Sequence, residues 1–187
     1  MATPVFTIAN QLTILRMALA PLLVILVLAR QLQWALVVFV VAGVTDLLDG
    51  LIARVGHQRT TLGAMLDPVA DKVLLNAAFV ALTWGPSLGQ PIPLWLTVTT
   101  LSRDAIILVS VTIINLTLGR RVFYPSLLGK LCTGSQLLTV GVVLLLNALD
   151  TPFPAVRYLF VVTLLLTVTS AFHYVYVASV RGAGAER

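Results

Sequence analysis

Charged residues are scarce in this chain of 187 residues, because Asp, Glu, Lys and Arg make up only 10% of it while hydrophobic residues make up 59%. Soluble domains carry about 25% charged residues. So small a share excludes an ordinary water-soluble domain. Together with a mean hydropathy of +1.02, it indicates an integral membrane protein.

Cysteine is nearly absent as well, since Cys132 is the only one. A single cysteine excludes a disulfide framework and a cysteine-based metal site. Basic residues exceed acidic ones by five, but no basic run is longer than the two residues Arg120 and Arg121. We therefore interpret the basic excess as cytoplasmic loops of a membrane protein, and we expect no nucleic-acid partner.

Apolar residues gather in long runs instead of alternating with polar ones, which is typical of membrane helices and not of membrane strands. Breaks rich in Gly, Pro and charge, such as GPSLGQPIP and LDTPFP, separate the runs. The sequence therefore predicts an all-α integral membrane protein, a bundle of six transmembrane helices that forms one domain over residues 1–187. The predicted spans are approximately 11–29, 33–53, 66–84, 93–117, 127–148 and 154–178.

Basic residues are divided unequally between the two sides of this predicted bundle. Six spans place both termini on one side, which holds seven basic residues, whereas the other side holds only Arg30 and Arg157. The positive-inside rule then places both termini in the cytoplasm. The seven residues on that side are Arg54, Arg59, Arg120, Arg121, Lys130, Arg181 and Arg187.

Acidic residues number only seven, and four of them stand close together in the stretches TDLLDGLIAR and LDPVADKVLL. Asp46 and Asp49 are three residues apart near the inner end of the second span. Asp67 and Asp71 are four residues apart at the start of the third, so each pair shares a helix face. A short turn makes the two spans antiparallel neighbours. We therefore expect both pairs at the same cytoplasmic depth, facing each other.

Four carboxylates this close would repel one another and would be costly to hold near hydrocarbon. Arg54 and Lys72 are near but cannot neutralise four charges, whereas a divalent metal can. All-oxygen ligands suit Mg²⁺ or Mn²⁺, and Mg²⁺ sites usually combine carboxylates with phosphate oxygens. The small residues Gly50, Ala53 and Gly63 leave room for such a ligand near the backbone. The four aspartates are therefore predicted to bind a metal ion.

Three alternatives compete with this interpretation of the aspartates, one of them a non-catalytic lipid-binding scaffold, which would not need all four carboxylates. In the structural alternative they only cap helices and pair with nearby basic side chains. Asp67 before Pro68 suits an N-cap followed by a first helical turn, but Asp46 and Asp49 sit inside an apolar span. The third alternative is a divalent-cation transporter with carboxylates along its pathway, although the acidic residues gather at one membrane face and not across it.

The residues from Asp46 to Asp71 have the spacing D-x2-D-G-x2-A-R-x8-G-x3-D-x3-D. This pattern resembles the signature of the CDP-alcohol phosphotransferase family, with no departure from it. The stretch ANQLTILRMALAP, residues 9–21, resembles the family's N-terminal segment. The blocks LSRDAI and PSLLGKLCTGSQ resemble later blocks of the branch that synthesises phospholipids.

The resemblance implies a membrane enzyme, usually dimeric, that moves a phosphatidyl group from CDP-diacylglycerol to an alcohol and releases CMP. It implies that Asp46, Asp49, Asp67 and Asp71 hold one or two Mg²⁺ or Mn²⁺ ions on the donor pyrophosphate, with Asp71 also the catalytic base. We expect a homodimer in a bacterial-type inner membrane, with a cytoplasmic active site. The residues expected to bind the CDP donor are Asp46, Asp49, Gly50, Ala53, Arg54, Gly63 and Asp67.

Two further basic residues, Arg103 and Lys130, are candidates for binding the alcohol acceptor. Arg103 lies midway along the fourth span, where an ionisable residue usually faces a cavity or a partner. It either binds the acceptor's phosphate or belongs to a buried interhelical pair. Since adjacent helix residues point about 100° apart, we expect that it does not simply pair with Asp104. Lys130, at the inner start of the fifth span, either binds the acceptor or extends to the membrane interface.

Two cations beside a metal site suggest an anionic acceptor. Glycerol 3-phosphate, the acceptor in phosphatidylglycerophosphate synthesis, is the one we expect. Phosphatidylglycerol is the alternative, because it also carries a phosphate, and its product would be cardiolipin.

Overall fold

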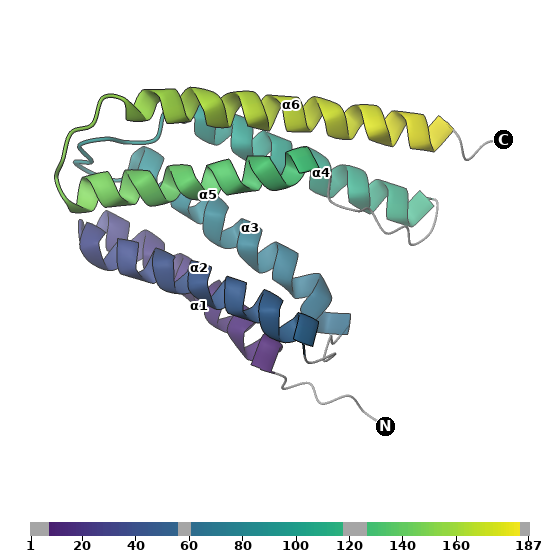
Figure 1. Ribbon diagram of the computed structural model, residues 1–187, viewed down its shortest axis with the longest axis horizontal. Coiled ribbons are helices and arrows are strands. Elements are labelled where there is room, and N and C mark those ends of the chain that lie inside the picture. The colour runs from purple at the N-terminus through teal and green to yellow at the C-terminus, as the bar shows by residue number, and fades with distance from the viewer. Residues whose placement is uncertain (1–7, 56–60, 118–126, 184–187) are drawn as a thin grey trace. The chain divides into compact units, whose positions relative to one another are not determined.

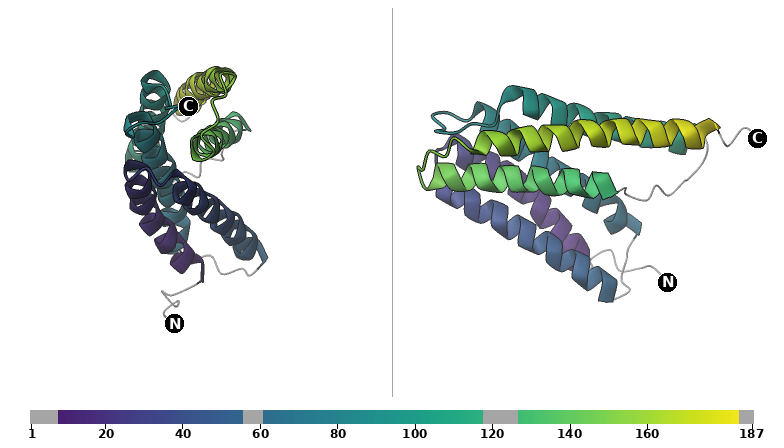
Figure 2. Two further views of the ribbon diagram at one scale, coloured as in Figure 1. Left: turned by 90° about the vertical axis from the view of Figure 1, so that its left-hand side faces the viewer. Right: turned by 45° about the horizontal axis from the view of Figure 1, so that its top comes forward.

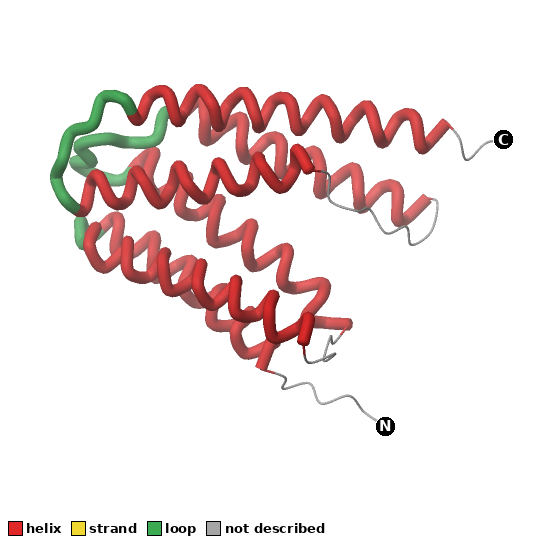
Figure 3. Tube along the Cα trace, in the orientation of Figure 1, coloured by secondary structure: helices red, strands yellow, loops and turns green. Residues whose placement is uncertain are grey.

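The structure is a computed structural model that describes residues 8–55, 61–117 and 127–183, with side chains described for 14–46, 72–110 and 127–174. Within these ranges the chain forms six helices and no strand (Figures 1 and 3). The all-α prediction is confirmed, and every helix end lies within five residues of the predicted span end. The helices are α1 (Ile8–Leu28), α2 (Leu32–Val55), α3 (Thr61–Trp84), α4 (Leu94–Thr117), α5 (Leu127–Ala148) and α6 (Val156–Ala183).

The six helices group into two compact units. Unit 1 comprises Met1–Pro91 and Val140–Phe153, which include α1, α2, α3 and the end of α5. Unit 2 comprises Ile92–Thr139 and Pro154–Arg187, which include α4, the first part of α5, and α6. The predicted single domain over residues 1–187 stays a prediction.

Helix α1 ends in a tight turn that returns the chain along α2. The Gln31 N–H donates to the Leu26 carbonyl at 2.9 Å, and the Arg30 N–H donates to the Val27 carbonyl at 3.1 Å. Arg30 adopts a left-handed conformation with φ 60°. This is the Schellman pattern of a helix C-terminus. The turn makes α1 and α2 antiparallel neighbours that pack side by side (Figures 1 and 2).

A small core cluster joins the three helices of unit 1. Ala20 of α1, Ala42 of α2 and Leu74 of α3 are all buried in it, and Leu19 and Ala77 pack against them. Small residues at helix contacts let the backbones approach closely. Because the cluster contains one residue from each helix, it sets which positions of α1, α2 and α3 lie at the same level.

The buried face of α1 continues through most of the helix. Ala20, Leu23 and Val27 are 1% exposed or less and recur every three or four residues, as positions on one helix face do. Arg16 lies on the same stripe, four residues before Ala20, and it is equally buried. The polar residue therefore belongs to the face that packs against α2 and α3.

Helix α3 begins at Thr61, five residues before the predicted start of the third span at residue 66. Leu62, Ala64 and Met65 favour a helical backbone, and the helix runs without interruption through Asp67 and Pro68. An N-cap residue has a non-helical backbone. The expectation that Asp67 caps the helix, with Pro68 in its first turn, is therefore wrong, whereas pairing of the four aspartates with nearby basic side chains is not contradicted by these bounds.

Two of the described helical segments are long and apolar enough to cross a membrane, namely Leu127–Ala148 and Val156–Tyr174. Shorter apolar stretches of 10–17 residues lie at Ile14–Leu28, Leu32–Asp46 and Lys72–Trp84. Large apolar side chains such as Leu108, Leu165 and Phe172 are exposed. An exposed apolar surface of this kind suits contact with lipid. These features agree with a helical membrane protein, and the prediction of six spans stays a prediction.

Candidate functional site

Asp46, the first aspartate of the motif, forms an ion pair with Arg16. The Arg16 Nη2 atom lies 2.9 Å from Asp46 Oδ1. The arginine side chain is 1% exposed, whereas that of Asp46 is 45% exposed. The pair is therefore buried on the side of α1 and open on the side of α2, so that Asp46 keeps an accessible carboxylate.

Arg16 is a residue of the site that the sequence analysis missed. A signal for it was present, because an ionisable side chain inside an apolar membrane helix marks a functional position by default. The pairing with Asp46 required the packing of α1 against α2, which residue spacing along one helix does not reveal. The charge of a buried arginine needs such a partner, because an isolated charge is costly in an apolar interior.

The ion pair lies one helical turn from the core cluster of unit 1. Arg16 comes four residues before Ala20, and Asp46 comes four residues after Ala42. Asp71 comes three residues before Leu74, so its backbone lies one turn from the same cluster on α3. A turn spans 3.6 residues and about 5.4 Å. Positions 16, 46 and 71 are therefore brought to a common level of the three helices.

The remaining motif positions follow in successive turns. Counted in helical turns from Asp46 and Asp71, Asp49 and Asp67 belong to the next level, and Ala53 and Gly63 to the one after it. Only residues 56–60 separate the end of α2 from the start of α3, so these helix ends lie at one end of unit 1 (Figure 1). That the two carboxylate pairs share one depth and face each other stays a prediction.

Most of the motif side chains lie outside those that the structure describes. They are Asp49, Gly50, Ala53, Arg54, Gly63, Asp67 and Asp71, all of which have a helical backbone in α2 or α3. Among the described side chains, no three of the types His, Cys, Asp and Glu gather to hold a metal. Asp46 is the one predicted ligand among them.

The donor set nevertheless fits a hard divalent cation. Carboxylate oxygens are the ligands that Mg²⁺ and Mn²⁺ prefer, whereas Zn²⁺ sites are built mainly from nitrogen and sulfur. Asp46 presents a carboxylate that is 45% exposed. Arg16 offsets the charge of Asp46, and a divalent cation would offset the charge of the other three aspartates, which are predicted to gather beside it.

Arg103 and Asp104 form a direct pair, so the expectation that these adjacent residues do not pair is wrong. Arg103 Nη1 donates to Asp104 Oδ1 at 2.8 Å, and both side chains are buried. The length of the arginine side chain lets its guanidinium reach the carboxylate of the neighbouring residue. Arg103 Nη2 also donates to Ser170 Oγ of α6 at 2.8 Å. Arg103 therefore ties α4 to α6.

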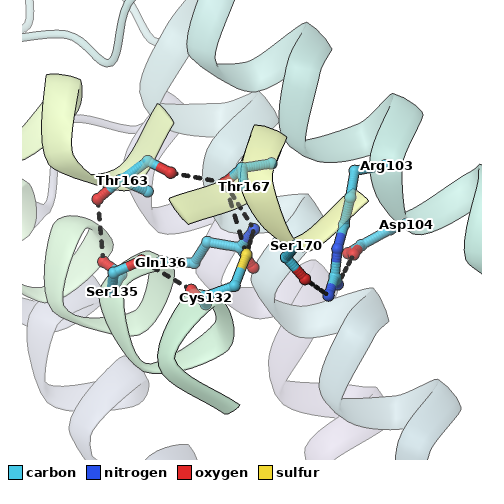
Figure 4. Close-up of polar contacts among 8 residues, drawn as sticks. All are labelled: Arg103, Asp104, Cys132, Ser135, Gln136, Thr163, Thr167 and Ser170. Atoms are coloured by element: carbon cyan, nitrogen blue, oxygen red, sulfur yellow. Dashed lines mark hydrogen bonds and ion pairs between the residues drawn. The ribbon is translucent and has the colours of Figure 1, made fainter. Parts of the chain in front are cut away.

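Arg103 ends a seam of buried polar side chains in unit 2 (Figure 4). Each of three helices contributes residues three or four positions apart, so the seam follows one face of each helix. Polar side chains at such positions hold membrane helices together by hydrogen bonds. The buried polar residues are Thr97, Thr100 and Arg103 of α4, Gln136 and Thr139 of α5, and Thr163, Thr167 and Ser170 of α6.

The hydrogen bonds of the seam join α5 to α6. The Thr139 and Thr163 hydroxyls lie 2.8 Å apart, and Gln136 Nε2 donates to Thr167 Oγ1 at 3.5 Å and to Cys132 Sγ at 3.4 Å. Cys132 is buried here as a free thiol. The seam was not predicted as a whole, because threonines in apolar runs give no signal until their helices pack together.

Three buried polar atoms in the seam have no hydrogen-bond partner within the described part of the chain: Thr100 Oγ1, Arg103 Nε and Gln136 Oε1. A buried donor or acceptor without a partner is destabilising by about 1–3 kcal/mol. The seam therefore has hydrogen-bonding capacity for a polar group from outside the chain. Lys130, the other predicted acceptor residue, lies exposed near the start of α5.

A cavity of about 350 Å³ opens at the α1–α2 turn, and Arg30, Trp34 and Asn147 are among the residues that line it. The turn lies at the end of α2 opposite to the motif. None of the predicted metal ligands lines the cavity. We therefore do not place the candidate site there.

Comparison with known proteins supports the resemblance that the motif carries. The family model described as CDP-alcohol phosphatidyltransferase matches residues 6–176, which run through both units. The match includes the motif from Asp46 to Asp71, as well as Arg16, Arg103 and Lys130.

Several curated proteins are similar to the chain. Cardiolipin synthase (CMP-forming) of Streptomyces coelicolor is 40% identical over 139 residues, which cover 69% of this chain and 60% of that protein. The human protein of the same name is 44% identical over 107 residues, or 57% of this chain and 34% of that protein. A probable phosphatidylglycerophosphate synthase of Mycobacterium tuberculosis is 35% identical over 178 residues, or 90% of this chain and 79% of that protein. The chain belongs to the CDP-alcohol phosphatidyltransferase family.

Proposed function

We propose that this protein transfers a phosphatidyl group from CDP-diacylglycerol to an alcohol acceptor and releases CMP. The observation that carries the proposal is the complete aspartate motif on α2 and α3, with Asp46 held by Arg16 at the level of Asp71. The family match and the names of the three relatives support it. They give no support to the transporter alternative.

Each part of the motif has a chemical role in this reaction. Asp46, Asp49, Asp67 and Asp71 would hold Mg²⁺ or Mn²⁺, which would offset the charge on the donor pyrophosphate. Gly50, Ala53 and Gly63 would leave space for the nucleotide, and Arg54 would meet its charge. An alcohol is a weak nucleophile until a base accepts its proton. Asp71 would be that base if it is the least tightly coordinated carboxylate.

The acceptor is proposed to be an alcohol that bears a phosphate group. Glycerol 3-phosphate is the acceptor expected from the sequence, and one relative that aligns over 90% of the chain is named for phosphatidylglycerophosphate synthesis, while another that aligns over 91% is named a probable cardiolipin synthase. Phosphatidylglycerol is the second candidate. The pairing of Arg103 with Asp104 favours it, because an arginine already offset by a carboxylate suits a singly charged phosphodiester better than a phosphomonoester of about −1.5 to −2. The two relatives with the higher identities are named cardiolipin synthases.

One assay tests the reaction and separates the acceptors. Purified protein is mixed with CDP-diacylglycerol and Mn²⁺ or Mg²⁺, and CMP release is measured with each acceptor in turn. We expect release with glycerol 3-phosphate or phosphatidylglycerol, and thin-layer chromatography identifies the lipid product. Serine and inositol phosphate are the comparison acceptors. The proposed reaction is excluded if none of the four acceptors gives CMP.

Arg103→Ala is expected to raise the KM for the acceptor by about tenfold or more and to leave the KM for CDP-diacylglycerol unchanged. The reason is the loss of the guanidinium that would contact the acceptor's phosphate. Ser170→Ala is the matched control, because it removes the hydrogen bond between α4 and α6 and keeps the cation. Equal acceptor KM values in Arg103→Ala and the unmodified protein would count against an acceptor role for Arg103.

We also propose the membrane arrangement. The helices α1 to α6 each cross the bilayer, both termini and the aspartate motif lie on the cytoplasmic side, and two copies form a homodimer in a bacterial-type inner membrane. The distribution of basic residues supports the orientation. This arrangement lets the lipid tails stay in the bilayer while CMP leaves to the cytoplasm.

A further inference from the structure

The ion pair between Arg16 and Asp46 joins a buried cation to a predicted metal ligand. Arg16 is 1% exposed and lies on the α1 stripe formed by Ala20, Leu23 and Val27. This stripe packs against α2 and α3. A side chain enclosed in this way has little freedom to turn elsewhere, so the position of its guanidinium is set by helix packing.

The ion-pair contact at hydrogen-bond distance is made to Oδ1 of the carboxylate. Arg16 Nη2 lies 2.9 Å from Asp46 Oδ1, within the range of a charge-assisted hydrogen bond. A divalent cation bound to Oδ1 would lie next to the guanidinium and would be repelled by it. The accessible remainder of the carboxylate, which is 45% exposed as a whole, is therefore best able to bind a metal through Oδ2.

We propose that Arg16 is a positioning residue that restricts Asp46 to coordination through one oxygen and thereby makes the site prefer Mn²⁺ or Mg²⁺ to Ca²⁺. The proposal rests on the proposed function of the four aspartates as metal ligands. Mg²⁺ requires near-octahedral geometry with short bonds, whereas Ca²⁺ takes six to eight oxygens and readily accepts both oxygens of a carboxylate. Withdrawing one oxygen therefore disfavours Ca²⁺ more than the smaller ions.

Arg16→Gln tests this selectivity without measuring turnover. Metal-free protein in detergent is titrated with Mn²⁺, and the electron paramagnetic resonance signal of free Mn²⁺ gives the Kd. Competition by Ca²⁺ gives the second Kd. We expect the ratio of the Ca²⁺ Kd to the Mn²⁺ Kd to fall about tenfold in Arg16→Gln, the scale on which groups bound to metal ligands alter metal sites.

Arg16→Lys is the conservative variant, because its ammonium group also carries the charge that can hold Oδ1. We expect its Kd ratio to stay within about threefold of the unmodified protein. Arg157→Gln is the matched control, since Arg157 is exposed in unit 2 and lies over the Tyr158 ring. A purely structural role of Arg16 would weaken binding of both ions by the same factor, so an unchanged ratio in folded Arg16→Gln overturns the proposal.

Folding is checked by size-exclusion chromatography and thermal unfolding. If Arg16→Gln does not fold, Asp46→Glu provides the same test from the other partner. The longer side chain keeps a carboxylate but no longer matches the position of Arg16, so the Kd ratio should again fall about tenfold. An unchanged ratio in folded Asp46→Glu would also contradict the proposal.

The CMP-release assay separates this proposal from the proposed function. If the unmodified protein releases CMP but the Kd ratio does not depend on Arg16, only the role of Arg16 is wrong. If it binds Mn²⁺ with an Arg16-dependent ratio but releases no CMP, only the reaction is wrong. Failure of the unmodified protein to bind Mn²⁺ would overturn the metal site and the role of Arg16 together.

Discussion

Asp71→Asn is expected to lower CMP release by about a thousandfold or more while the helices stay folded. The substitution keeps the size of the side chain and removes both its charge and its ability to accept a proton. A positioned general base contributes about 10²–10⁴-fold to a rate, and the same carboxylate is a predicted metal ligand. The measurement is the turnover number at saturating donor, acceptor and Mn²⁺.

Asp150→Asn is the matched control for this experiment. It makes the same chemical change outside the motif, in the turn that follows α5, where Asp150 has a left-handed backbone with φ 48°. Asparagine accepts that conformation well, so activity should be retained. Circular dichroism should show the same helix content in both variants. Turnover within tenfold of the unmodified protein in Asp71→Asn would remove its assignment as the base.

Removal of divalent cations is expected to abolish CMP release, and addition of Mg²⁺ or Mn²⁺ should restore it. Without a cation, the motif carboxylates and the donor pyrophosphate would repel one another, since Arg16 offsets only one of the negative charges. The protein is dialysed against a chelator, and CMP release is then followed as each ion is added back. Full CMP release by the metal-free protein would contradict the predicted metal dependence.

A chelator saturated with Mg²⁺ beforehand is the control for that experiment, because it exposes the protein to the same molecule without removing metal. Ca²⁺ should restore less activity than Mn²⁺ in the unmodified protein. Ca²⁺ and Mn²⁺ are compared at concentrations that fill the metal site equally. Equal CMP release with the two ions would show that the preference of the site for the smaller ions does not affect the reaction.

The helices could be predicted from the sequence with little error. Apolar runs of about 20 residues separated by Gly, Pro and charged residues determine where helices begin and end, and the structure confirms these bounds to within five residues. The start of α3 and the end of α6 were the least accurate, each five residues from its prediction; for α3, Pro68 suggested a first turn at a point where the helix had already begun. Proline is only one of several possible start signals.

The pattern of aspartates could also be predicted, because three- and four-residue spacings are local properties of a helix. Residue spacing did not predict whether two neighbouring charged side chains pair. The direction of the helix positions indicated that Arg103 and Asp104 would stay apart, but a long flexible side chain reached its neighbour at 2.8 Å. Rotamer choice depends on surrounding packing, here on Ser170 of α6.

The sequence by itself determined the class of protein, the positions of the helices and the family, because these depend on composition, hydrophobic runs and fixed spacing along one chain. Only the tertiary structure decided which partners the buried charges have. Arg16 meets Asp46 across 30 residues because Ala20, Ala42 and Leu74 bring three helices into one register. Arg103 meets Ser170 because α4 packs against α6. Such pairs depend on side-chain contacts between helices, which spacing within a helix does not specify.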